Sequence, residues 1–170
     1  MDAELAGLLE SRGGALLTRE PETTATVVAR SVELKAGVVA EDERETTGRR
    51  AILNYGHTAA HALEAASGYT VLHGRAVAFG MRVAARVAAD RGLCEMDLVA
   101  TQDRFLQHFG LPGDLPPVSV DAILAALPRD KKSSGGRIRW VLPRELGRAE
   151  VGHEVPEGVV RDAVSKVAPS

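Results

Sequence analysis

Apolar positions recur every three to four residues over most of the chain, the spacing that places side chains on one face of a helix. Between Asp2 and Leu17 the pattern is interrupted at Gly13 and Gly14, so two short helical pieces are expected there. Longer helices are predicted over Pro21–Ala40, Arg50–Ser67, His73–Arg91, Asp97–Phe109, Ser119 or Asp121 to Leu127, and Glu157–Val167.

Polar residues and glycines indicate where these helices begin and end. Thr23 or Thr24 is a candidate N-cap for the helix that starts near Pro21, and Asp97 is one for a later helix. The charged run 41–45 is predicted to be a solvated loop. Glycines stand where a left-handed residue often ends a helix, at Gly68, Gly92 and Gly110.

The pattern changes after the Leu111-Pro112-Gly113 break and the short helix that follows it. Residues 137–142 alternate between polar and apolar side chains, and residues 147–151 could return as an antiparallel partner. One small hairpin is therefore predicted. The expected fold class is mainly α, a multi-helix domain with one β-hairpin that occupies residues 1–170 as a single unit.

Composition excludes several classes of protein. Aromatic residues make up only 4% of the chain against 45% hydrophobic residues in all, which favours close-packed helices over an aromatic-rich sandwich. A net charge of -2 gives no reason to expect nucleic acid as a partner. No apolar run approaches the roughly 20 residues of a membrane span. Cys94 is the single cysteine, and the acidic N-terminus does not resemble a signal peptide, so the cytoplasm is the expected location.

Three histidines are candidates for chemistry. His57 and His61 are four residues apart, so a helix would place both imidazoles on one face, as helical zinc sites require. Two structural histidines would show the same spacing. Gly56 before His57 and Gly74 after His73 favour a site, because each glycine costs about 1 kcal/mol of helix propensity and a ligand would need the space.

The stretches around these histidines read LNYGHTAAHALE over residues 53–64 and LHGRAVAFGM over residues 72–81. They resemble the signature of the 3-dehydroquinate synthase family, which runs roughly LNxGHTxGHAxE and then LHGExVAxGM. Because the two motifs occur in the same order and spacing, the resemblance is far more specific than the histidine spacing alone.

Further family motifs flank the histidines. Residues 33–39 and 42–45 resemble the family's lysine-bearing helix and its DExE loop, and residues 129–132 and 138–143 resemble its DKK element and hairpin. The resemblance implies a lyase of the shikimate pathway, which leads to aromatic amino acids. Such enzymes convert a seven-carbon keto-acid sugar phosphate into 3-dehydroquinate, using NAD to oxidise and later reduce a ring carbon while phosphate is eliminated.

The resemblance also implies roles for individual residues. His57 and His73 correspond to two ligands of a Zn²⁺ or Co²⁺ ion, which would polarise the hydroxyl that loses hydride. His61 corresponds to a catalytic histidine near the substrate, suited to proton relay. The remaining matches are substrate contacts for a carboxylate and a phosphate, with Lys131 also catalytic: Lys35, Arg50, Asn54 and Lys131.

The sequence departs from the family at several points. Ala60 replaces a glycine, the loop before Arg50 is one residue longer, and Arg75 replaces the glutamate of HGE, which reverses a charge two residues from His73. The family's third metal ligand, a glutamate in an AEVxK-like motif, and an NAD phosphate loop have no counterpart here. The N-terminal NAD-binding domain is therefore expected to be absent.

Three hypotheses follow. In the first, the chain is the helical half of a cyclase that is inactive without an NAD-binding half, joined or separate; family members are often dimers, so a homodimer is a further candidate assembly. In the second, it is a non-catalytic descendant. In the third, it belongs to a different enzyme with the same architecture, such as a cyclase for another sugar phosphate or a polyol dehydrogenase. The predicted cationic contacts favour a phosphorylated acid over a simple polyol as the substrate.

Overall fold

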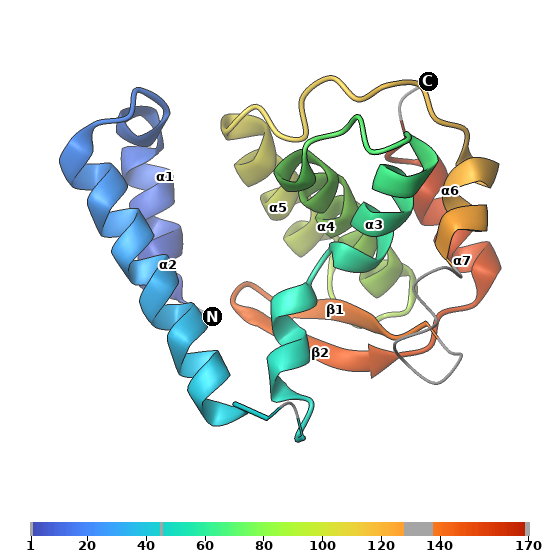
Figure 1. The fold of residues 1–170 in the computed structure, drawn as a ribbon, viewed down its shortest axis with the longest axis horizontal. Coiled ribbons are helices and arrows are strands. Elements are labelled where there is room, and N and C mark those ends of the chain that lie inside the picture. Colours follow the sequence, from blue (N-terminus) through green and yellow to red (C-terminus); the bar gives the residue numbers. More distant parts are fainter. Residues whose placement is uncertain (1, 45, 128–137, 169–170) are drawn as a thin grey trace.

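The computed structural model describes residues 2–44, 46–127 and 138–168. Helices lie above and beside one two-stranded antiparallel sheet, as Figure 1 shows. The elements in chain order are α1 (Ala3–Leu17), α2 (Pro21–Glu41), the 3₁₀ helix η1 (Arg49–Asn54), α3 (His57–Ala66), α4 (His73–Asp90), α5 (Met96–His108), α6 (Val120–Ala126), β1 (Trp140–Glu145), β2 (Arg148–His153) and α7 (Glu157–Ser165). The predicted fold class, mainly helical with one small hairpin, is confirmed.

Helix α4 lies at the centre of the core. It packs against α3, α5, α7 and β1, and α3 also contacts α6. Alanines such as Ala84 and Ala88 are fully buried on α4, so its neighbours approach closely around the larger side chains of Leu63, Phe79 and Trp140. The core therefore forms from α3 onward, with α4 as the helix that most other elements touch.

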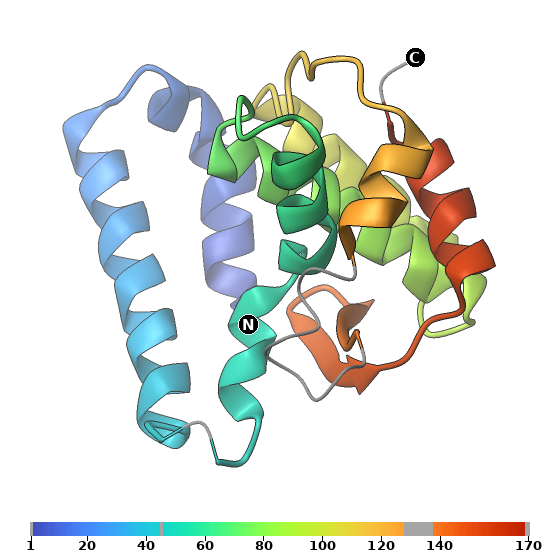
Figure 2. The ribbon, with the colours of Figure 1, turned by 45° about the vertical axis from the view of Figure 1, so that its right-hand side comes forward.

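Helices α1 and α2 form a hairpin beside this core. Figures 1 and 2 show α1 on the side of α2 that faces the rest of the molecule. Among the side chains that the structure describes, the buried apolar ones begin at Ile52, and Val28 and Val32 of α2 are more than half exposed. The main contacts of α2 are with α1 and η1. This hairpin is therefore less well buried than the rest of the fold.

The predicted helix over Arg50–Ser67 is wrong in one respect, because the chain breaks it at Tyr55 and Gly56. Gly56 has a φ of +82°, which a residue with a side chain rarely adopts. Its carbonyl lies against α4, where a Cβ on Gly80 would meet it at 1.9 Å. The break thus allows α3 to start in contact with α4, with His57 as its first residue.

The N-terminal predictions also need correction. Helix α1 runs through Gly13 and Gly14 without interruption. A Cβ on Gly13 would lie 2.3 Å from the ring of His108, so this glycine is the point of close approach between α1 and α5. Glu20 rather than Thr23 or Thr24 stands at the N-cap position of α2, before Pro21, and its side chain makes no cap hydrogen bond.

Two further polar predictions are wrong. Glu95, not Asp97, stands at the N-cap position of α5, without a side-chain cap hydrogen bond. Within the charged run, Asp42 is buried, and its carboxylate accepts the backbone N–H groups of Thr46, Thr47 and Arg50. These hydrogen bonds hold the pKa of Asp42 below its usual value, the bond from Thr47 contributing most. The run is therefore partly an ordered turn.

Other predicted helix ends and the hairpin agree with the structure. Gly68, Gly92 and Gly110 all have positive φ after their helices, and the Ser119 hydroxyl accepts from the Ala122 backbone to start α6. The hairpin pairs β1 with β2 in the expected antiparallel sense, a few residues later than predicted. Among the described residues, no helix is long and apolar enough to cross a membrane.

Candidate metal and substrate site

Three imidazoles meet where α3 and α4 begin. The ring centroids of His57 and His73 are 5.3 Å apart, those of His57 and His61 are 5.6 Å apart, and those of His61 and His73 are 6.2 Å apart. His57 and His61 lie one turn apart on α3, and His73 is the first residue of α4. The structure therefore brings together the three histidines that the sequence singled out.

Backbone geometry orients His57. Its Nδ1 lies 3.3 Å from the carbonyl oxygen of Tyr55, which can only accept a hydrogen bond, so Nδ1 carries the proton and Nε2 keeps its lone pair. Burial lowers the pKa of His57, and the neighbouring imidazoles of His61 and His73 lower it further. His57 thus favours the neutral form that binds a metal ion.

The spacing of the imidazoles fits a shared divalent ion. Two rings that bind one tetrahedral ion through nitrogens at about 2.0–2.1 Å place their centroids about 5 Å apart. The pair closest to this separation is His57 and His73 at 5.3 Å. Over residues 2–44, 46–127 and 138–168, no three His, Cys, Asp or Glu side chains form a group that could hold a metal by itself. A complete site therefore needs a further ligand.

His61 borders a small cavity between α3 and the end of α6. The cavity has a volume of about 170 Å³, and its lining includes Thr58, His61, Tyr69 and Leu127. Tyr69 is 77% exposed and has a φ of 62°, unusual for a residue with a side chain. Sequence reasoning missed Thr58 and Tyr69. The signal available for Tyr69 was an aromatic residue directly after the helix-ending Gly68.

The predicted substrate contacts are not all near the histidines. Asn54 is exposed at the end of η1, three residues before His57. Arg50 is half-buried in the same helix, with its backbone N–H bonded to Asp42. Lys35 is exposed on α2, whose main contacts are with α1 and η1 rather than α3 or α4. Lys131 lies outside the described residues.

Arg75, the residue that replaces the family glutamate, extends toward the loop after α5. Its guanidinium donates to the carbonyl oxygen of Asp114 at 3.5 Å. The side chain is exposed. The positive side chain at this position therefore contacts the loop after α5.

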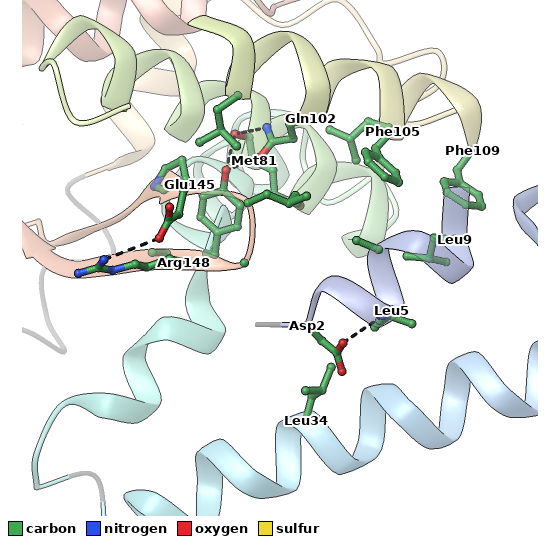
Figure 3. A pocket seen from close by; sticks show the side chains of 18 residues that line it. Asp2, Leu5, Leu9, Leu34, Met81, Gln102, Phe105, Phe109, Glu145 and Arg148 are labelled. Carbon is green, nitrogen blue, oxygen red and sulfur yellow. Dashed lines mark hydrogen bonds and ion pairs between the residues drawn. The ribbon is translucent and has the colours of Figure 1, made fainter. Parts of the chain in front are cut away.

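A second cavity, of about 340 Å³, lies between α1, α5 and the β-hairpin, as Figure 3 shows. Its lining is mainly apolar: Leu5, Leu9, Leu34, Leu98, Phe105, Phe109, Pro143 and Leu146. On one wall the Tyr55 hydroxyl donates to Gln102, whose amide donates to the Met81 carbonyl at 2.9 Å. Burial raises the pKa of Tyr55. These hydrogen bonds hold the side chain of Tyr55, the residue directly before Gly56.

Comparisons with known proteins identify relatives of the chain. The family model for the C-terminal region of 3-dehydroquinate synthase matches residues 1–133. The 3-dehydroquinate synthase of Rhodopirellula baltica is 44% identical over 96% of this chain and 44% of the relative, and that of Nostoc punctiforme is 42% identical over 96% and 46%. The chain thus spans less than half the length of these relatives.

Two solved structures share the fold. The 2-epi-5-epi-valiolone synthase of Streptomyces hygroscopicus, with NAD⁺ and Zn²⁺ bound, superposes with a TM-score of 0.84 at 28% identity, over 98% of this chain and 46% of that one. A 2-deoxy-scyllo-inosose synthase complexed with carbaglucose-6-phosphate, NAD⁺ and Co²⁺ gives a TM-score of 0.77 at 25% identity, over 86% and 42%.

Proposed function

Because this chain belongs to the 3-dehydroquinate synthase family, we propose that it is the metal- and substrate-binding part of an enzyme that converts a seven-carbon keto-acid sugar phosphate into 3-dehydroquinate. The observation that carries the proposal is the 5.3 Å separation of His57 and His73, which suits one shared divalent ion. The relatives named 3-dehydroquinate synthase are 44% and 42% identical to the chain, against 28% and 25% for the two cyclases of known structure, which favours dehydroquinate as the product.

In this proposal His57 and His73 hold Zn²⁺ or Co²⁺ through their Nε2 atoms. When bound, the ion supplies a Lewis acid that polarises the substrate hydroxyl about to lose hydride. A third ligand comes from outside the residues described. The structures with Zn²⁺ and Co²⁺ are of cyclases on the same fold, which supports these two metals as the candidates.

His61 moves protons at the substrate in this scheme. It is exposed, and its ring centroid is 5.6 Å from that of His57 and 6.2 Å from that of His73, so it lies close enough to act on a substrate held beside the two ligand rings. Asn54 and Arg50 orient the substrate from η1. Lys131 and Lys35 neutralise its phosphate and carboxylate, as their family motifs imply.

NAD is bound by a separate part of the enzyme, in the half of the relatives that this chain does not match. The NAD⁺ in both related cyclase structures supports NAD as the cofactor. The active assembly is therefore this chain together with an NAD-binding half, joined or separate, with a homodimer as its expected higher assembly. Cys94, a half-buried single thiol, is compatible with a cytoplasmic location.

Turnover by an assembled enzyme tests the proposal. The chain is combined with the N-terminal half of the Rhodopirellula baltica relative, and phosphate release from the seven-carbon keto-acid sugar phosphate is measured with NAD⁺ and Co²⁺ present. We expect release that needs both halves and is lost in His61→Ala, while His108→Ala, a histidine on α5 outside the cluster, retains it. Phosphate release that survives His61→Ala undiminished, or an assembled complex that binds metal and NAD⁺ but releases no phosphate, would overturn the assignment.

A further inference from the structure

Glu64 is a carboxylate that the proposed function leaves without a role. It lies on α3, three residues after His61, and its side chain is only 14% exposed. Its Oε1 lies 3.0 Å from Nδ1 of His73 on α4, whose side chain is 57% exposed. Within the described part of the chain its ion-pair partner is this imidazole. A mostly buried carboxylate is therefore directed at a largely exposed candidate ligand.

This contact determines which ring nitrogen of His73 is available. An ionised carboxylate can only accept hydrogen bonds, so Nδ1 of His73 carries the proton and Nε2, on the other side of the ring, keeps its lone pair. The Tyr55 carbonyl imposes the same arrangement on His57. Both rings are thus held in the tautomer in which Nε2 can bind one ion.

The two histidines reach this state by different means. A backbone carbonyl two residues away orients His57, whereas a side chain from a different helix orients His73. His73 is also the first residue of α4, and its side chain is largely exposed except where its ring lies beside those of His57 and His61. Without Glu64, nothing comparable among its described contacts would fix the ring's rotation.

We propose that Glu64 is a positioning residue that holds His73 as the Nδ1–H tautomer and aims its Nε2 at the ion shared with His57. The proposal rests on the proposed function, because it needs His73 to be a ligand. Carboxylates that orient a metal-bound histidine also increase the basicity of the coordinating nitrogen, and losing one typically costs 10–100-fold in metal affinity. We expect a loss of that size for Glu64→Ala.

The first test reads the tautomer without any metal. Long-range ¹H–¹⁵N correlation spectra of the histidine-labelled chain distinguish Nδ1–H from Nε2–H imidazoles. We expect His73 to be Nδ1–H in the unmodified chain and in Glu64→Gln, whose amide oxygen still accepts. In Glu64→Ala we expect it to shift toward the Nε2–H form that imidazole prefers in water. A His73 that is already Nε2–H in the unmodified chain would overturn the inference.

The second test measures Co²⁺ affinity by calorimetry on the chain combined with the NAD-binding half of a relative. Glu64→Ala should weaken binding 10–100-fold, Glu64→Gln less, and Glu157→Gln, which removes an exposed carboxylate on α7, not at all. Equal affinities for Glu64→Ala and Glu157→Gln would contradict the role of Glu64. If His73→Ala also left the affinity unchanged, the ligand assignment itself would fail, so the two failures are distinguishable.

Discussion

The close contact between Gly56 and Gly80 predicts that adding one methyl group, in Gly80→Ala, destabilises the fold. In Gly80→Ala the new Cβ would lie 1.9 Å from the Gly56 carbonyl oxygen and 2.9 Å from the Ala60 nitrogen. Carbon and carbonyl oxygen need about 3.3 Å, so α3 and α4 must separate by more than 1 Å at this point. Both atoms that the methyl meets are backbone, which no side-chain rotation can relieve.

The magnitude follows from two opposing effects. Overpacking of this kind costs about 1–3 kcal/mol, and replacing glycine by alanine within a helix returns about 0.5–1 kcal/mol. We expect Gly80→Ala to lower the free energy of unfolding by about 1–2 kcal/mol, which lowers the melting temperature by roughly 2–8 °C in a chain of this size. Because the same movement takes His57 on α3 away from His73 on α4, the assembled protein should also bind Co²⁺ more weakly.

A matched variant on the same helix provides the control. A Cβ on Gly74 of α4 would have no atom within 4 Å, so Gly74→Ala should be neutral or stabilise the chain by up to about 1 kcal/mol. Both variants are compared by thermal unfolding followed by circular dichroism. If Gly80→Ala melts at the same temperature as Gly74→Ala, the close approach of α3 to α4 is not a feature of the folded chain.

Three further predictions concern the surroundings of the site. Gln102→Leu leaves the half-buried Tyr55 hydroxyl with only the Met81 carbonyl, 3.4 Å away, as an acceptor, and should cost about 1–3 kcal/mol in urea unfolding. Tyr55→Phe should cost less because Gln102 keeps its bond to the Met81 carbonyl; equal costs would contradict this network. Asp42→Asn should destabilise the chain most above pH 3.8, the ordinary pKa of the carboxyl. The difference in melting temperature should shrink as the pH falls through the lower folded-state pKa, and a pH-independent difference would refute the assigned hydrogen bonds. Arg75→Ala should change the free energy of unfolding by no more than about 0.5 kcal/mol, since the exposed side chain donates one long hydrogen bond; a larger loss in the same urea experiment would contradict that placement.

The sequence predicted most of the helices because apolar spacing reflects burial against a common core. It failed where a contact between distant segments decided the backbone. Gly56 lowers helix propensity but does not by itself predict a break, because the contact that requires the break is with Gly80 on the next helix. The predicted break at Gly13 is wrong because this glycine has another purpose. It lets α1 pass close to His108, which lies far along the chain and could not be foreseen from the local sequence.

In the candidate site too, the sequence predicted what its motifs carry and missed what depends on helix packing. The motifs predicted that His57, His61 and His73 act together, and their rings lie within 6.2 Å of one another. The motifs could not assign a task to Glu64, because its contact with His73 depends on how α3 and α4 pack. Their placement of Lys35 in the substrate site stays a prediction, since α2 has its main contacts elsewhere.

Metal binding tests the central claim most directly. Zn²⁺ or Co²⁺ binding is measured by calorimetry on the chain alone and after it is combined with the NAD-binding half of a relative. The account predicts weak binding by the chain alone and tight binding by the combination, lost in His57→Ala and in His73→Ala but not in His108→Ala. Absence of binding in both cases, or tight binding that survives both ligand substitutions, would contradict a metal site shared by these two histidines.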